Sequence, residues 1–162
     1  MILAAFTLFH VVLSLVGIAA GFVVLQGLMT AKWSDRWTLV FLTTTAATSV
    51  TGFLFPFHEF LPSHGVGIVS LIVLAIAIPA LYVYHLTGAW AKTYAITAVM
   101  ALYLNVFVLI VQLFLKVPLL HAMAPTQSEP PFLVTQVIVL LIFAVLGYRA
   151  ASSLRGQPLQ AA

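Results

Sequence analysis

The chain contains no cysteine among its 162 residues, and only 6% of its residues are charged. The absence of cysteine excludes disulfide bonds, thiolate metal sites, iron–sulfur ligation, c-type haem attachment and a cysteine nucleophile. The scarcity of charge excludes an ordinary soluble domain, in which about a quarter of the residues are charged. Because 64% of the residues are hydrophobic, the chain has too little polar surface to cover itself in water, and a lipid bilayer must be its main solvent.

The sequence also lacks the common catalytic and nucleotide-binding motifs. It has no GxSxG, no HExxH and no P-loop, and His58-Glu59 lacks the second histidine of a zincin. The net charge of +3 would suit nucleic acid, but the six basic residues are scattered singly, whereas a phosphate-binding surface needs them clustered. The sequence therefore favours a protein that is not an enzyme and does not bind nucleic acid.

Five stretches are long and apolar enough for membrane spans, which take about 20 mostly apolar residues each. The second is marginal because it holds many threonines. The first has no basic residue before its apolar run, unlike a secretory signal peptide, and is predicted to be retained as a span. The predicted spans cover residues 2–29, 37–55, 66–86, 93–115 and 132–150. The expected fold is an all-α integral membrane protein, a bundle of five transmembrane helices forming one domain over residues 1–162.

The basic residues predict the orientation of these spans. If the chain crosses five times, only Lys116 falls on one side of the membrane. The residues on the other side are Lys32, Arg36, Lys92, Arg149 and Arg155. Because cytoplasmic loops carry the excess of lysine and arginine, that side is predicted to be cytoplasmic. The N-terminus is then outside, and the C-terminus lies in the cytoplasm of a cell with a bacterial-type inner (plasma) membrane.

Small and polar residues predict which helix faces point inward. Gly17 and Gly21 form a GxxxG pair, which lets a neighbouring helix approach closely. His10 lies seven residues before Gly17, within about 20° of it on the helix, and is expected to face protein. In the second span Thr44 and Thr48 share a face. Their hydroxyls either bond to carbonyls of their own helix or line a polar pathway.

The fourth predicted span carries a second polar stripe. Asn105, Gln112 and Lys116 lie within about 20° of one another at offsets of seven and eleven residues. Such a stripe is typical of hydrogen bonding between membrane helices. It also fits one wall of a site that opens toward the outer side, because Lys116 stands at the outer end of the span.

Most of the histidines and acids are predicted to converge at the outer rim of the bundle. The residues of this predicted site are His10, His58, Glu59, His64, His121 and Glu129. Imidazole and carboxylate groups suit a transition metal, and two imidazoles at similar depth suit a haem. Histidines at this rim also fit a proton relay, because they titrate near neutral pH. A third interpretation is that the loop histidines simply sit among lipid headgroups.

Three functions remain open on the sequence. The first is a small multi-pass inner-membrane protein whose outward-facing His/Glu site binds a transition metal or haem. The second is a non-catalytic accessory or assembly subunit, acting as a homo-oligomer or within a larger membrane complex; the GxxxG pair and the lack of extramembrane mass favour it. The third is a small ion or proton channel or transporter. Its predicted lining comprises Thr44, Thr48, Asn105, Gln112 and Lys116.

Overall fold

The computed structural model describes residues 2–56, 62–154 and 160–161, and they are mostly helical. The long helices are α1 (Ile2–Met29), α2 (Asp35–Gly52), α3 (Pro62–Tyr82), α4 (Ala89–Lys116) and α6 (Pro130–Ser153). A short helix, α5 (Pro118–Met123), lies in the connection between α4 and α6. The two-residue strands β1 (Lys32–Trp33) and β2 (Gln160–Ala161) pair in parallel. The five predicted helical stretches are confirmed, with ends that differ by about one turn at most.

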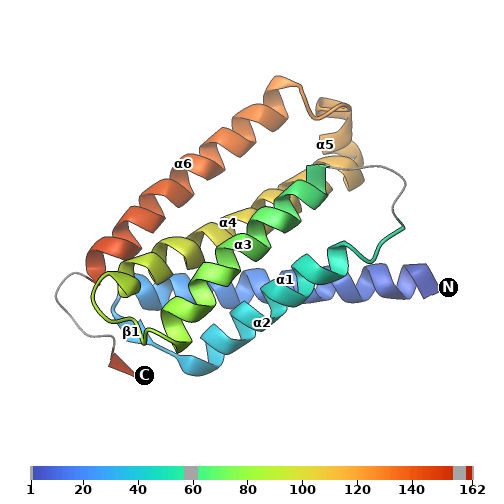
Figure 1. Ribbon diagram of the computed structural model, residues 1–162. Helices are drawn as coiled ribbons and strands as arrows, with labels where there is room; N and C mark the ends of the chain where they lie inside the picture. The colour runs from blue at the N-terminus through green and yellow to red at the C-terminus, as the bar shows by residue number, and fades with distance from the viewer. Residues whose placement is uncertain (1, 57–61, 155–159, 162) are drawn as a thin grey trace.

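The long helices run in alternating directions, and the two termini lie at opposite ends of the bundle (Figure 1). One end holds the start of α1, the end of α2 and α5; we call it the α5 end. The other holds the end of α1, β1 and the end of α6; we call it the β1 end. Each long helix therefore begins at the end of the bundle where the preceding long helix finishes (Figure 1).

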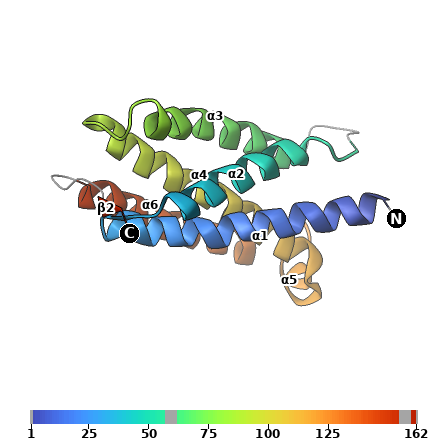
Figure 2. The same cartoon turned by 90° about the horizontal axis from the view of Figure 1, so that it is seen from below.

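The first four helices enclose the core, and α6 lies outside them. α1 packs against α2 and α4, and α3 packs against the same two helices. α2 and α4 therefore face each other diagonally across the interior, which is filled by Phe41, Leu102 and Tyr94. α6 covers α4 and, to a lesser extent, α1 (Figures 1 and 2).

Four helices are long and apolar enough to cross a membrane, and they make up most of the described chain. They are Ile2–Met29, Ser63–Tyr82, Ala89–Lys116 and Pro130–Ser153. These helices fit a multi-pass helical membrane protein. α2 is not among them, because its two charged residues and seven hydroxyl side chains make it much less apolar than the other four. That α2 also crosses the membrane therefore stays a prediction.

Two glycines set the close approach of α1 to its neighbours. A Cβ atom on Gly17 would lie 3.0 Å from Thr44 Oγ1. One on Gly21 would lie 2.6 Å from Leu102 Cδ1 and 2.9 Å from the Phe41 ring. The close packing predicted from the GxxxG pair is confirmed, and the partners are α2 and α4 of the same chain.

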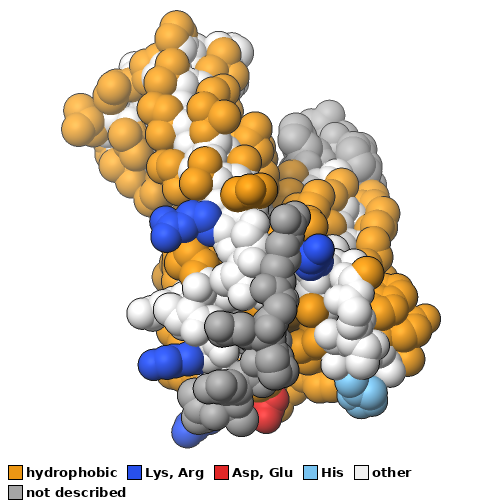
Figure 3. All heavy atoms as spheres, turned by 90° about the vertical axis from the view of Figure 1, so that its left-hand side faces the viewer, with side chains coloured by type: hydrophobic (Ala, Val, Ile, Leu, Met, Phe, Trp, Pro, Cys, Tyr) orange, Lys and Arg blue, Asp and Glu red, His pale blue; other side chains and the backbone are white. Residues whose placement is uncertain are grey.

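The described basic residues divide between the two ends as the sequence predicted. Lysine and arginine side chains appear on the β1 end, which faces the viewer in Figure 3. Those in β1 or in helix turns at this end are Lys32, Arg36, Lys92 and Arg149. Lys116 closes α4 at the α5 end, and Arg155 lies outside the described residues.

Candidate functional site

Polar side chains of α2 contact each of the other three core helices. Together with their neighbours they run along the inside of the bundle, and we call them the polar seam. Its members are Thr38, Thr45, Thr48, Ser49 and Thr51 of α2, His10 of α1, Ser70 of α3, and Tyr94 and Asn105 of α4. The helix with the least apolar composition is thus the one whose polar groups hold the bundle interior together.

The middle of the polar seam joins α2 to α4 and α3. Asn105 Nδ2 donates a hydrogen bond to Thr45 Oγ1 at 3.1 Å, and both residues are buried. One turn further along, Ser49 Oγ lies 3.0 Å from Ser70 Oγ and also donates to the Thr45 carbonyl oxygen at 2.9 Å. The inward orientation predicted for Asn105 is confirmed, with Thr45 as its partner.

At the α5 end, the polar seam holds an imidazole. His10 is half-buried, and its Nδ1 lies 2.8 Å from Thr51 Oγ1. The ring of Phe55 meets the imidazole edge-on, with centroids 5.1 Å apart. Gly52 leaves room for it, since a Cβ atom there would lie 3.8 Å from His10 Cε1. The prediction that His10 faces protein is confirmed.

Two hydroxyls of the polar seam are buried without a hydrogen-bond partner. Tyr94 is fully buried at the β1 end, and its hydroxyl is one of the two; the Thr38 side chain lies beside it. Thr48 Oγ1 is the other. Buried polar groups are nearly always paired with protein or ordered water, so each of these hydroxyls marks a place where a water molecule would gain hydrogen bonds.

An apolar layer divides the polar seam. Between Thr38 and Thr45 the α2 helix rises by about 10 Å, at 1.5 Å per residue. The interior at this level is filled by Phe41 and Leu102, each only 1% exposed, with Gly21 of α1 packed against both. The polar seam therefore consists of a short segment near the β1 end and a longer one reaching the α5 end.

The predicted metal ligands do not converge where they are described. His64 is buried and stacks on Phe53, with ring centroids 5.8 Å apart. His121 is exposed on α5. Within residues 2–56, 62–154 and 160–161, no group of three His, Cys, Asp or Glu side chains could hold a metal ion. His58 and Glu59 lie outside the described residues.

Glu129, the remaining predicted ligand, organises the turn that precedes α6. Its carboxylate accepts hydrogen bonds from Thr126 N and Oγ1 and from Ser128 N. Desolvation raises the pKa of Glu129, but these hydrogen bonds outweigh it and hold the pKa below its ordinary value. Because folding lowers this pKa, the carboxylate stabilises the turn at pH values above the ordinary glutamate pKa. This stabilisation is lost as the pH falls through the lowered pKa.

The predicted channel lining is only partly brought together. Thr48 and Asn105 lie inside the bundle, and Thr44 donates to the Val40 carbonyl oxygen at 2.6 Å while facing Gly17. Gln112 and Lys116 are exposed on α4. The buried face of α4 changes toward the α5 end. There the buried apolar residues are Ile110, Phe114, Ala124 and Phe132, contributed by α4, α6 and the turn after α5.

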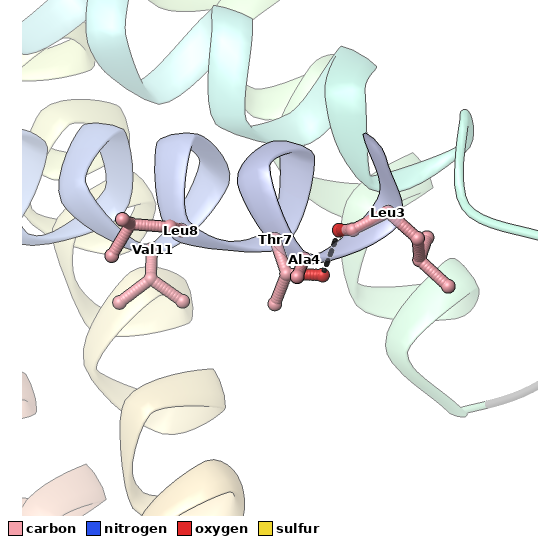
Figure 4. A pocket seen from close by; sticks show the side chains of 5 residues that line it. All are labelled: Leu3, Ala4, Thr7, Leu8 and Val11. Carbon is pink, nitrogen blue, oxygen red and sulfur yellow. Dashed lines mark hydrogen bonds between the residues drawn. The ribbon is translucent and has the colours of Figure 1, made fainter. Parts of the chain in front are cut away.

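A shallow depression on α1 carries no chemistry. It is lined by Leu3, Ala4, Thr7, Leu8 and Val11, all from the outward face of one helix (Figure 4). The Thr7 hydroxyl is already used, because it donates to the Leu3 carbonyl oxygen at 2.8 Å. The depression is an apolar surface suited to lipid.

No protein-family model, curated protein or solved structure matches the chain.

Proposed function

We propose that the protein is a small channel or transporter for protons. The observation that carries this proposal is the polar seam, which combines an imidazole at the α5 end with buried hydroxyls that lack a protein partner. An ionisable side chain within a membrane span is costly and commonly marks a proton or ion pathway. His10 is such a residue, and Thr51 is its partner.

The proposal includes a five-span topology in a bacterial-type inner membrane, with the N-terminus outside and the C-terminus cytoplasmic. Its support is the alternation of helix directions and the position of the described basic residues (Figures 1 and 3). The 18 residues of α2 cover about 27 Å at 1.5 Å per residue, close to the hydrocarbon thickness of about 30 Å. The polar side chains of α2 are compatible with a span because other helices cover them.

Hydrogen-bonded packing alone accounts for only part of the polar seam. The Thr45–Asn105 and Ser49–Ser70 pairs are the usual polar contacts of membrane helices. A structural role does not call for a titratable ring at His10 or for unpaired hydroxyls in the interior. Both are expected of a path that water and protons enter.

The layer formed by Phe41 and Leu102 is the natural gate of such a path. Apolar constrictions block conduction by excluding water, and they open when side-chain movement lets water in. Here the layer separates Tyr94 at the β1 end from the longer polar segment. Proton passage in this proposal therefore requires hydration of the Phe41 layer.

The two other functions have less support. A metal or haem site has less support, because no three His, Asp or Glu side chains come together within residues 2–56, 62–154 and 160–161, and the Glu129 carboxylate is used by its own turn. An accessory subunit would offer a docking face, yet the exposed apolar side of α6 is equally suited to lipid. A homo-oligomer or a partner complex stays a prediction.

Replacing Asn105 with leucine tests the path in the middle of the membrane. We expect proton flux into liposomes, driven by an imposed potential and read with a trapped pH dye, to fall to the level of protein-free vesicles. The reason is that leucine removes the side-chain amide that donates to Thr45 of α2 and leaves an apolar group in its place. Gln112→Leu is the matched control, because Gln112 is exposed on the same helix. Equal flux in wild type and Asn105→Leu would remove Asn105 from the path.

A further inference from the structure

The hydrogen bonds around Thr51 define the tautomer of His10. Thr51 Oγ1 lies 2.7 Å from the Ala47 carbonyl oxygen and 3.2 Å from that of Thr48. The Thr51 hydroxyl has a single hydrogen, and its contacts direct that hydrogen at these two carbonyl oxygens, which can only accept. The contact of 2.8 Å with His10 is then a bond in which Nδ1–H donates to Thr51 Oγ1. In the neutral ring, Nε2 consequently carries the lone pair.

We infer that Thr51 is a positioning residue that makes Nε2 the only basic atom of His10, so that protons both arrive and leave there. This inference rests on the proposed function. A proton taken from water forms the Nε2–H bond and gives an imidazolium, whose Nδ1–H bond to Thr51 is unchanged. The same Nε2–H bond breaks when the proton returns to water. The Nδ1 proton cannot move on through Thr51, because the threonine hydrogen is directed at a carbonyl that does not take part in proton transfer.

The surroundings of the imidazole contain no second titrating group among the described residues in contact with it. α2 contributes Thr51 and Gly52, and the segment after α2 contributes the edge of Phe55. Phe6 of α1 packs on Phe55 in turn, with centroids 4.9 Å apart. The orientation of the ring is therefore set by one hydrogen bond and by aromatic packing, and Thr51 is the residue whose removal frees it.

The test is nitrogen NMR of the full chain, labelled with ¹⁵N-histidine, in lipid bicelles at a pH where His10 is neutral. His10 signals are assigned by their loss in His10→Phe. We expect a protonated Nδ1 and an unprotonated Nε2 in the wild type and in Thr51→Ser, and a shift of the proton to Nε2 in Thr51→Val. Thr43→Val is the matched control, since Thr43 is exposed on the same helix and donates to the Leu39 carbonyl oxygen in the same way.

The inference would be overturned if the neutral His10 ring of the wild type carried its proton on Nε2. It would also be overturned if the proton stayed on Nδ1 in Thr51→Val. The tautomer is read without any flux measurement. A protein that passes no protons would therefore refute the proposed function alone, whereas a wrong tautomer would refute the positioning role of Thr51 alone.

Discussion

Replacing His10 with phenylalanine is expected to lower proton flux in liposomes about 100-fold or more, the usual effect of losing a positioned proton-transfer group. Phenylalanine keeps an aromatic ring against Phe55 and beside Gly52, so the packing of α1 on α2 changes little. What is lost is the basic nitrogen at the α5 end of the polar seam. Flux is measured as acidification of potassium-loaded vesicles after valinomycin addition.

His121→Phe is the matched control for His10→Phe. His121 is predicted on the same side of the membrane, but it is exposed on α5 and contributes nothing to the bundle interior. Its replacement should leave the flux unchanged. Wild-type flux in His10→Phe, with vesicles of equal protein content, would show that the imidazole is not part of the path.

Gly21→Ala is expected to destabilise the bundle by about 1–3 kcal/mol, the usual cost of inserting a methyl group into a tightly packed interior. The new Cβ atom would lie 2.6 Å from Leu102 and 2.9 Å from Phe41, so both buried side chains must move. The measurement is the shift of the unfolding midpoint in mixed detergent micelles on titration with sodium dodecyl sulfate.

Gly147→Ala provides the comparison for Gly21→Ala. Its Cβ atom would meet Val99 at 3.5 Å, an ordinary van der Waals distance, within the same kind of helix. It should be neutral, or stabilising by about 0.5–1 kcal/mol through helix propensity. Equal unfolding midpoints for the two variants would contradict the close α1–α2–α4 contact at Gly21.

The sequence was sufficient to predict the helices and the two inward positions on α1. Apolar length predicts α1, α3, α4 and α6 because lipid requires it. Helical spacing places His10 and Gly17 on one face, and both contact α2. These predictions succeeded because each depends only on residues within a single helix.

The partners within the polar seam could not be predicted in the same way. The threonine-rich second span offers several polar faces, and helical spacing groups Thr44 with Thr48. The structure shows that Thr38, Thr45 and Ser49 face the interior, at offsets of seven and eleven residues that place them within about 40° of each other. That spacing could have identified these three residues as one face of α2. The side chains that they contact belong to other helices, and spacing within α2 does not identify those.

Gln112 and Lys116 show why a single helical stripe can mislead. They share the face of Asn105 by spacing, yet only Asn105 is buried. Near the α5 end, α4 buries Ile110 and Phe114 on its other side, against α6 and the turn after α5. A helix that changes partners along its length changes its buried face, and no pattern within that helix reveals where this happens.

The central claim is that α2 crosses the membrane as the polar helix of a five-span bundle. Its most direct test is to measure which single cysteines react with a membrane-impermeant maleimide. The chain has no cysteine of its own, so each variant carries one reactive site. Thr30→Cys, Thr87→Cys and Ser128→Cys occupy exposed positions in three connections between the long helices. We predict that positions 30 and 87 react from one side of the membrane and position 128 from the other. Labelling of positions 30 and 128 from the same side, with 87 opposite, would mean that α2 does not cross and would contradict the proposal.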